Sequence, residues 1–352
     1  MNYPHDCLQN TKHDFVLVKY PPSKKHDPEY APFRSVVYHN NTLVCTSPSK
    51  SMSYETFKGT YPIDECVVEE FLEGTMINTW YCQDKWHIAT RSILGAECTF
   101  ETDRTFASMF YECLNNTTIE LNPKYCYSMV MQHPENRIVS VLEKRLYIVG
   151  VYEIVDQVVR EVHEPTEHSP PRYVVQSYEE AEALAQTVGG KGLMLKCKGE
   201  RCKIKRTAYY AQETEKGNTS FHYRYLSVRS TPERESFLET FPFYQEDASR
   251  VEKEIDEAIR VLYNTYVSVY IRKQFLSKEF SYKKFLYEIH MIYVHTIRPG
   301  RITSVRVRQY VHQLPPNQLT ILLRVLKTPR IELPILDTPP LSLPSPDQVL
   351  RL

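Results

Sequence analysis

The sequence lacks the features that would place the protein in a membrane, in a secretory pathway or in a strongly charged complex. Its longest apolar runs are far shorter than a bilayer span, and residues 1–9 lack the apolar core of a secretory signal. Its 43 basic and 43 acidic residues give a formal net charge of zero, so nucleic acid would have to be bound by local patches. We therefore expect a cytoplasmic protein with no membrane partner.

The sequence also lacks a recognisable set of metal or cofactor ligands. Its nine cysteines are odd in number and scattered, which favours free thiols over a disulfide framework. Cys197 and Cys202 lie five positions apart, but no second Cys or His pair with zinc-finger spacing accompanies them. No haem or flavin signature is present. We expect no resident metal site and no certain cofactor.

The stretch from Cys66 to Phe100 carries the strongest pattern. Residues 67–70, 76–82 and 86–91 read as strands, with a turn between the last two. Between the first two strands stands Phe-Leu-Glu-Gly-Thr at 71–75. An acidic residue, a glycine and a hydroxyl before a strand suit a nucleotide cradle, and Arg91 can meet phosphate from the returning strand. The alternative is an ordinary hairpin in which Glu-Gly is only a turn.

Three further stretches complete the pattern. Residues 125–139, YCYSMVMQHPENRIV, read as a strand that ends at Pro134, followed by a polar turn. Residues 191–195, KGLML, read as a strand that follows a helix capped by Ser177. After a short hairpin comes Cys-Lys-Ile-Lys at 202–205.

The order and spacing of these stretches resemble the nucleotidyl-transfer core of ATP-dependent RNA ligases of the T4 RNA ligase 1 type. The resemblance covers residues 34–230. It implies an α+β nucleotidyltransferase domain, built of ATP-grasp-like antiparallel sheets with flanking helices. By the same resemblance, Lys203 and Lys205 would neutralise phosphates, and Lys50 stands near an upstream lysine of the family. The candidate nucleotide- or RNA-binding residues are Lys50, Glu73, Gly74, Thr75, Arg91, Lys203 and Lys205.

Three positions depart from the family pattern. Phe71 stands where the family has the lysine that accepts AMP, Val130 where it has a ribose-binding glutamate, and Lys191 where it has a metal-organising glutamate. Because phenylalanine offers no nucleophile, we expect no covalent adenylate and assign no catalytic residue. ATP and Mg²⁺ would be cofactors only if activity survives through another amine, for which the candidates are Lys50, Lys58 and Lys85.

From about residue 231 the pattern changes to helices, which we expect at 250–275, 282–297, 303–313 and 316–326. Residues 269–331 contain twelve Lys and Arg against Glu279 and Glu288, a surface that could follow an RNA backbone. The alternative is a solvated bundle whose charge is balanced elsewhere.

We divide the chain into an N-terminal extension (1–33), a ligase-like domain (34–230), a basic all-α domain (231–328) and a proline-rich tail (329–352) that could dock on partner proteins.

Three functions follow from this interpretation. The first is a catalytically inactive ligase-like protein that binds RNA or nucleotide. The second is an active but atypical ATP-dependent RNA ligase, and the third is a structural or assembly protein that uses the fold as a scaffold. The combination of Phe-x-Glu-Gly-Thr, His-Pro-Glu-Asn-Arg-Ile-Val and a basic helical end is similar to T4-ligase-like proteins of large DNA viruses. That likeness implies a viral protein in the host cytoplasm, a virus factory or the virion.

Overall fold

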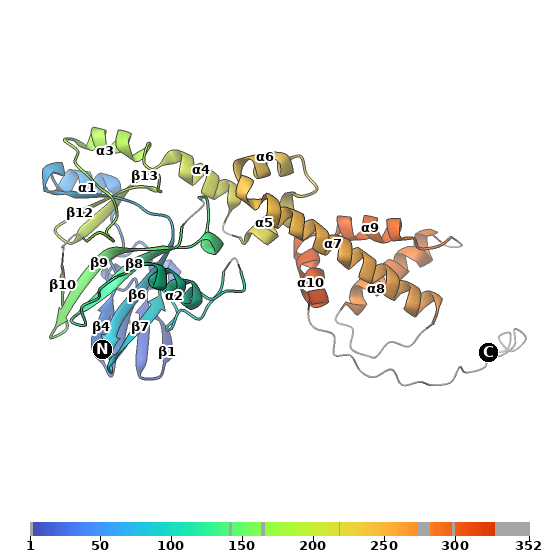
Figure 1. Ribbon diagram of the computed structural model, residues 1–352, viewed down its shortest axis with the longest axis horizontal. Helices are drawn as coiled ribbons and strands as arrows, with labels where there is room; N and C mark the ends of the chain where they lie inside the picture. Colours follow the sequence, from blue (N-terminus) through green and yellow to red (C-terminus); the bar gives the residue numbers. More distant parts are fainter. Residues whose placement is uncertain are drawn as a thin grey trace, which may run out of the picture. The chain divides into compact units, whose positions relative to one another are not determined.

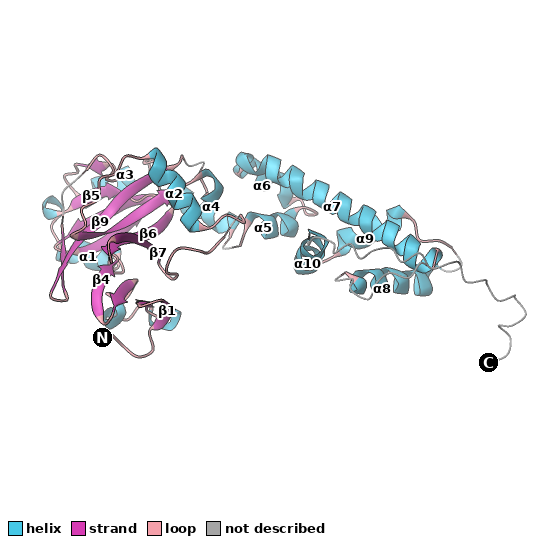
Figure 2. Ribbon diagram, turned by 60° about the horizontal axis from the view of Figure 1, so that its bottom comes forward, coloured by secondary structure: helices cyan, strands magenta, loops and turns pink. Residues whose placement is uncertain are grey.

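The computed structural model describes residues 3–100, 102–140, 143–162, 166–217, 219–273, 282–297 and 300–327. The chain forms two compact units, Met1–Ser249 and Arg250–Leu352 (Figure 1). The described strands lie in the first unit, and the described part of the second is helical (Figure 2). The predicted α+β class is therefore confirmed. The predicted proline-rich tail at 329–352 lies outside the described residues.

A five-stranded antiparallel sheet with the order β10-β9-β8-β6-β7 forms the centre of the first unit. Its strands are β6 (Thr75–Cys82), β7 (Lys85–Thr90), β8 (Tyr125–Gln132), β9 (Arg145–Val155) and β10 (Val158–Glu161). Helix α2 (Phe106–Asn116) covers one face, where Phe110 joins Ile77, Met129 and Leu146 in a buried cluster. Thr105 caps this helix, because its side chain accepts the Ser108 N–H.

A four-stranded antiparallel sheet covers the other face. It consists of β1 (Leu8–Lys12), β2 (Phe15–Lys19), β3 (Val36–His39) and β4 (Thr42–Thr46) in sequence order. Phe15 and Leu17 pack with Trp80 and Cys126 of the central sheet in one buried cluster. The segment predicted as an N-terminal extension thus supplies two strands of this sheet, β1 and β2.

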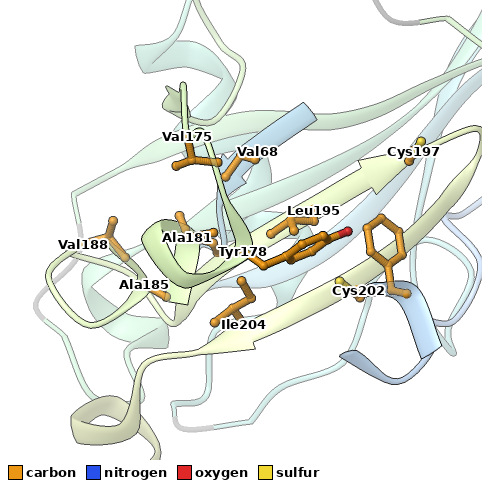
Figure 3. Packing of buried hydrophobic residues seen from close by; sticks show 12 residues of the cluster. Val68, Val175, Tyr178, Ala181, Ala185, Val188, Leu195, Cys197, Cys202 and Ile204 are labelled. Carbon is orange, nitrogen blue, oxygen red and sulfur yellow. The ribbon is translucent and has the colours of Figure 1, made fainter. Parts of the chain in front are cut away.

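The third sheet, with the order β11-β5-β12-β13, carries most of the resemblance motifs. It contains β5 (Val67–Glu70), β11 (Arg172–Tyr173), β12 (Gly192–Cys197) and β13 (Glu200–Lys205). Helices α1 (Tyr54–Thr60) and α3 (Tyr178–Ala185) contribute to the core on one face, where Tyr178 and Ala181 meet Leu195, Cys202 and Ile204 (Figure 3). As predicted, Ser177 caps α3 by accepting the Glu180 N–H. The charged, proline-containing sequence at 156–173 favours a surface loop, but the region includes β10 and β11.

Helices complete both units. The first contains α4 (Thr207–Lys216), α5 (Phe221–Val228) and α6 (Glu233–Thr240), and α7 (Gln245–Tyr266) begins there. The second contains the rest of α7 with α8 (Lys283–Ile292), α9 (Ser304–Gln313) and α10 (Pro316–Lys327). Helix α7 begins before the predicted residue 250 and gives way to a π-helical turn after Tyr266. Among the described residues, no helix is both long and apolar enough to cross a membrane.

Candidate functional site: a basic cavity between two sheets

A cavity of about 520 Å³ lies in the first unit, lined by residues of both the central sheet and the β11-β5-β12-β13 sheet. It brings together seven positions singled out from the sequence. These are Phe71, Gly74, Thr75, Arg91, Val130, Lys191 and Lys203. Glu73, Lys205 and Lys50 do not line it.

Phe71 follows β5 directly and is fixed by backbone pairing to the start of β12. Its N–H donates to the Gly192 carbonyl over 2.8 Å, and its carbonyl accepts the Lys191 N–H over 2.6 Å. Two ammonium groups approach its ring. The Nζ atom of Lys203 lies 4.5 Å from the ring centroid and that of Lys191 lies 5.6 Å away. Both ammonium groups therefore lie close enough to the phenyl ring for cation–π attraction.

Strand β13 supplies its cations by simple alternation. Successive side chains of a strand point to opposite faces, so Cys202 and Ile204 enter the core beneath α3 while Arg201 and Lys203 line the cavity. Burial lowers the pKa of Lys203 to about 8, and the neighbouring cations, Arg34 first, add to this effect. Burial also lowers the pKa of Arg34.

The cavity is strongly biased toward positive charge. Among the described residues, its basic side chains are Arg34, Arg91, Lys191, Lys196, Arg201 and Lys203, and its carboxylates are Glu69 and Glu70. Three of the cations have carboxylate partners: Lys191 with Glu213 at 3.1 Å, Lys196 with Glu69 at 2.6 Å and Arg201 with Glu161 at 3.9 Å.

The other three cations are Arg34, Arg91 and Lys203. Within the described part of the chain, their side chains make no hydrogen bond and no ion pair. Positive groups held together without counter-charges favour an anionic ligand.

The loop that precedes β6 has a structural reason for its glycine. Gly74 has φ +140°, and a Cβ atom there would lie 2.4 Å from the carbonyl oxygen of Met131. The next residue, Thr75, accepts a hydrogen bond from Asn136 over 2.7 Å. Gly74 and Thr75 thus line the cavity while they dock the loop on β8 and on the turn that follows it.

Glu73 lies in the same loop but serves a different purpose. Only 2% of the residue is exposed, and its carboxylate accepts the backbone N–H groups of Ile138, Val139 and Ser140. These contacts hold the segment after β8. The carboxylate is therefore committed to the scaffold, away from the ligand space for which the sequence analysis selected it.

The turn after β8, with the signature His-Pro-Glu-Asn-Arg, is likewise a scaffold. His133 is fully buried, and its two ring nitrogens contact Glu112 and the Glu135 N–H. Arg104 bridges the carboxylates of Glu112 and Glu135, and Lys144 also pairs with Glu112. Hydrogen bonds with Lys144, Arg104 and His133, in decreasing order of effect, lower the pKa of the Glu112 carboxyl group to about 2.

The other lysines selected from the sequence lie elsewhere. Lys50 donates to the carbonyl oxygen of Lys25, Lys58 of α1 pairs with Glu179 and Glu182, and Lys85 is exposed at the start of β7. Lys205 is exposed beyond the cavity, with its Nζ atom 4.6 Å from the centroid of the Tyr210 ring. None of these amines lines the cavity.

Arg34, Lys196 and Arg201 line the cavity but were not selected from the sequence. Two of them carried a usable signal. Once β12 and β13 are assigned as strands, period-two alternation places Lys196 with Met194 and Arg201 with Lys203. Arg34 lies just before β3, and no local pattern connects it to this site.

The donor set of the cavity does not fit Mg²⁺, the ion that the sequence resemblance associates with an active ligase. Magnesium requires oxygen ligands, usually one or two carboxylates with water and substrate phosphate. Glu69 is engaged by Lys196 and by Arg172, and Glu70 accepts the Tyr173 hydroxyl over 3.0 Å. No cluster of three or more His, Cys, Asp or Glu side chains suited to a metal occurs among the described residues.

No family model matches the chain, and no curated protein matches it. The solved structures that are similar to it include the following two. A protein of Aquifex aeolicus described as a candidate ATP-dependent DNA ligase matches with a TM-score of 0.39 and 13% identity, over 74% of this chain and 78% of that one. An archaeal ATP-dependent RNA ligase matches with a TM-score of 0.36 and 13% identity, over 71% of this chain and 73% of that one. Both likenesses are distant.

Proposed function

We propose that the protein binds the phosphate groups of a nucleotide or of an RNA end in the basic cavity and forms no covalent intermediate with them. One observation carries this proposal. Six basic side chains line a single cavity of about 520 Å³, and the two carboxylates there are already engaged. Arg34, Arg91 and Lys203 remain available for phosphate oxygens, which arginine and lysine bind through charge-assisted hydrogen bonds.

The apolar part of the cavity supports the same ligand class. Phe71, Met76, Val130, Phe106 and Met194 contribute to its walls. Nucleotide sites combine such walls, which accept a base, with a few placed polar groups that fix the phosphates. Lys203, to which the sequence resemblance assigned phosphate binding, is one of the basic residues that line the cavity.

The proposed absence of a covalent step rests on the nucleophile. Phe71 offers no amine, and Lys50, Lys58 and Lys85 lie away from the cavity. Attack on an α-phosphate requires a deprotonated amine in line with it, which none of these positions supplies. The protein is therefore a ligand-binding relative of a transferase in this proposal.

A second candidate function has one specific observation in its favour. Lys203 lines the cavity beside Phe71, and its pKa is about 8. A fraction of this amine is neutral near physiological pH and could attack the α-phosphorus of ATP. An N–P bond would form, pyrophosphate would leave and the amine proton would pass to water.

One experiment separates these functions. The full chain is dialysed against ATP labelled at the α-phosphate, with and without Mg²⁺, and part of each sample is run on a denaturing gel. We expect bound label in dialysis and no label on the denatured chain. A labelled band that disappears in Lys203→Arg would establish the second function, whereas no bound nucleotide under either condition would overturn the first.

RNA is the second ligand to test. A 5′-phosphorylated oligoribonucleotide is expected to compete with ATP for the cavity, and the same oligonucleotide with a 5′-hydroxyl is expected to compete poorly. The basic second unit is a weaker candidate, since Arg308 pairs with Asp256 and Lys327 with Glu254 of α7. If neither ATP nor RNA binds, the predicted assembly role in a virus factory or virion becomes the better hypothesis.

A further inference from the structure

Two ammonium groups converge on one wall of the cavity. Backbone pairing fixes Lys191 next to Phe71, and its Nζ atom also lies 5.0 Å from the centroid of the Tyr209 ring. Lys203 reaches the same phenyl ring from β13. Glu213 of α4 pairs with Lys191 at 3.1 Å but does not line the cavity. Within the described part of the chain, this region of the lining therefore offers positive charge from two lysines, and the carboxylate that pairs with Lys191 belongs to a residue outside the lining.

Two carboxylates, Glu69 and Glu70, line the cavity from β5 of the same sheet, and both are committed to neighbours. The Glu69 carboxylate lies 2.6 Å from Lys196 and 3.0 Å from Arg172, and only 3% of its side chain is exposed. Recruiting it as a metal ligand would leave Lys196, whose side chain is only 12% exposed, without its carboxylate partner, which is costly. Glu70 is then the one carboxylate left among the described lining residues, and one of its oxygens already accepts the Tyr173 hydroxyl. That leaves Mg²⁺ the minimum of the one or two carboxylates that its sites use.

From these two lysines and the committed carboxylates we infer that the cavity takes the polyphosphate of a nucleotide free of divalent metal, with Lys191 and Lys203 supplying the charge that a metal ion would otherwise supply. This inference rests on the proposed function and specifies its ligand. A nucleotide that carries Mg²⁺ is less negative and has fewer free phosphate oxygens. It therefore binds more weakly to a site built of ammonium and guanidinium groups.

The test measures the affinity of the full-length protein for ATP in EDTA and in excess Mg²⁺, at matched ionic strength. We expect binding in EDTA to be several-fold tighter. Inorganic triphosphate, used as a second probe, shows how much of this metal-free binding the phosphates alone supply. Tighter binding in Mg²⁺ would overturn the inference while leaving the proposed function intact. Absence of ATP binding under both conditions would overturn the proposed function itself.

A charge-exchange variant sharpens the test. Lys191→Glu combined with Glu213→Lys retains an ion pair and the net charge but places a carboxylate in the cavity. We expect ATP affinity in EDTA to fall by about tenfold or more, the loss of one charge-assisted hydrogen bond, and Mg²⁺ to restore part of it. The matched control exchanges Lys58 and Glu179, a pair outside the cavity at 3.0 Å, and should leave both affinities unchanged.

An unchanged magnesium response in the Lys191/Glu213 exchange would contradict the role of Lys191. If that double variant does not fold, Lys191→Met replaces it. Removing this ammonium should weaken metal-free binding and reduce the ratio between the two conditions. A ratio equal to that of the wild type would again contradict the inference.

Discussion

The turn after β8 and the cavity beside it differ in how far their charged groups are paired. In the turn, His133, Glu135, Asn136 and Arg137 each have a described partner, and Glu73 is saturated by backbone donors. In the cavity, Arg34, Arg91 and Lys203 have no hydrogen-bonding or ionic partner among the described residues. Saturated polar groups hold a scaffold together, whereas unsaturated cations leave capacity for a ligand. Stretches that resemble motifs of one family therefore serve two purposes in this chain: some hold the scaffold together, and others line the cavity.

The largest expected effect is on the scaffold side. Glu73→Ala leaves the N–H groups of Ile138, Val139 and Ser140 without their acceptor, and should cost about 3 kcal/mol or more of stability. Scanning calorimetry on the full chain measures the loss. Glu97→Ala, at an exposed site, is the matched control and should change little. Equal small effects of both substitutions would contradict the scaffold role of Glu73.

On the cavity side, Lys203→Met should stabilise the protein. The pKa of Lys203 in the folded protein is about 8, below the ordinary value of 10.5, so the folded state disfavours the charged lysine. This cost is fully present below pH 8 and disappears as the pH rises toward 10.5. We expect a gain on the order of 1 to 2 kcal/mol at pH 7, after discounting for partial contact with water.

The check is thermal unfolding of Lys203→Met and wild type at pH 7 and again at pH 10, where the difference should shrink. A variant that is less stable than wild type at pH 7 would show that Lys203 stabilises the fold. That result would contradict the contrast between a paired turn and an unpaired cavity.

Ligand binding should depend on pH through the same lysine. As the pH rises from 7 to 9.5, the unliganded protein loses the Lys203 charge around pH 8, and ATP affinity should fall by about tenfold. A bound phosphate raises this pKa, so the liganded form loses the proton at higher pH. Lys203→Arg keeps its charge and should bind with little pH dependence. Equilibrium dialysis at several pH values decides, and a flat wild-type profile would contradict the account.

The smallest expected effect concerns a lysine outside the cavity. Lys58 pairs with Glu179 and Glu182 at the surface, and hydrogen bonds to them raise its pKa. Lys58→Met should therefore lower the unfolding temperature only slightly and leave ATP binding unchanged. Loss of ATP binding in this variant would give Lys58 the role that the sequence analysis considered and the cavity geometry does not support.

Much of the fold was within reach of the sequence because its signals are local. Alternation predicted β6 and β8, the resemblance motifs predicted β12, and a serine cap predicted the start of α3. The strand β1 was missed, since its residues are largely exposed and its place depends on pairing with β2. Helix α7 departs from its prediction at both ends, because its apolar stripe gives the period of a helix better than its limits.

The site was predictable only in part. The sequence identified Phe71, Gly74, Thr75, Lys191 and Lys203, because each lies in or directly next to a recognisable strand, within a stretch that resembles a family motif. The sequence could not separate Glu73 from the ligand space, since only tertiary structure brings residues 138–140 to its carboxylate. For the same reason the sequence could not predict that Arg34 lines the cavity, since Arg34 belongs to a segment outside the motifs.

The most direct test of the central claim compares two lysines of one motif. Lys203 and Lys205 lie two positions apart on β13, but only Lys203 lines the cavity. ATP affinity is measured for the full chain with Lys203→Met and, separately, with Lys205→Met. The account predicts a loss of about tenfold or more for Lys203→Met and little change for Lys205→Met. Equal losses in the two variants, or no loss in Lys203→Met, would contradict the assignment of the cavity as the phosphate site.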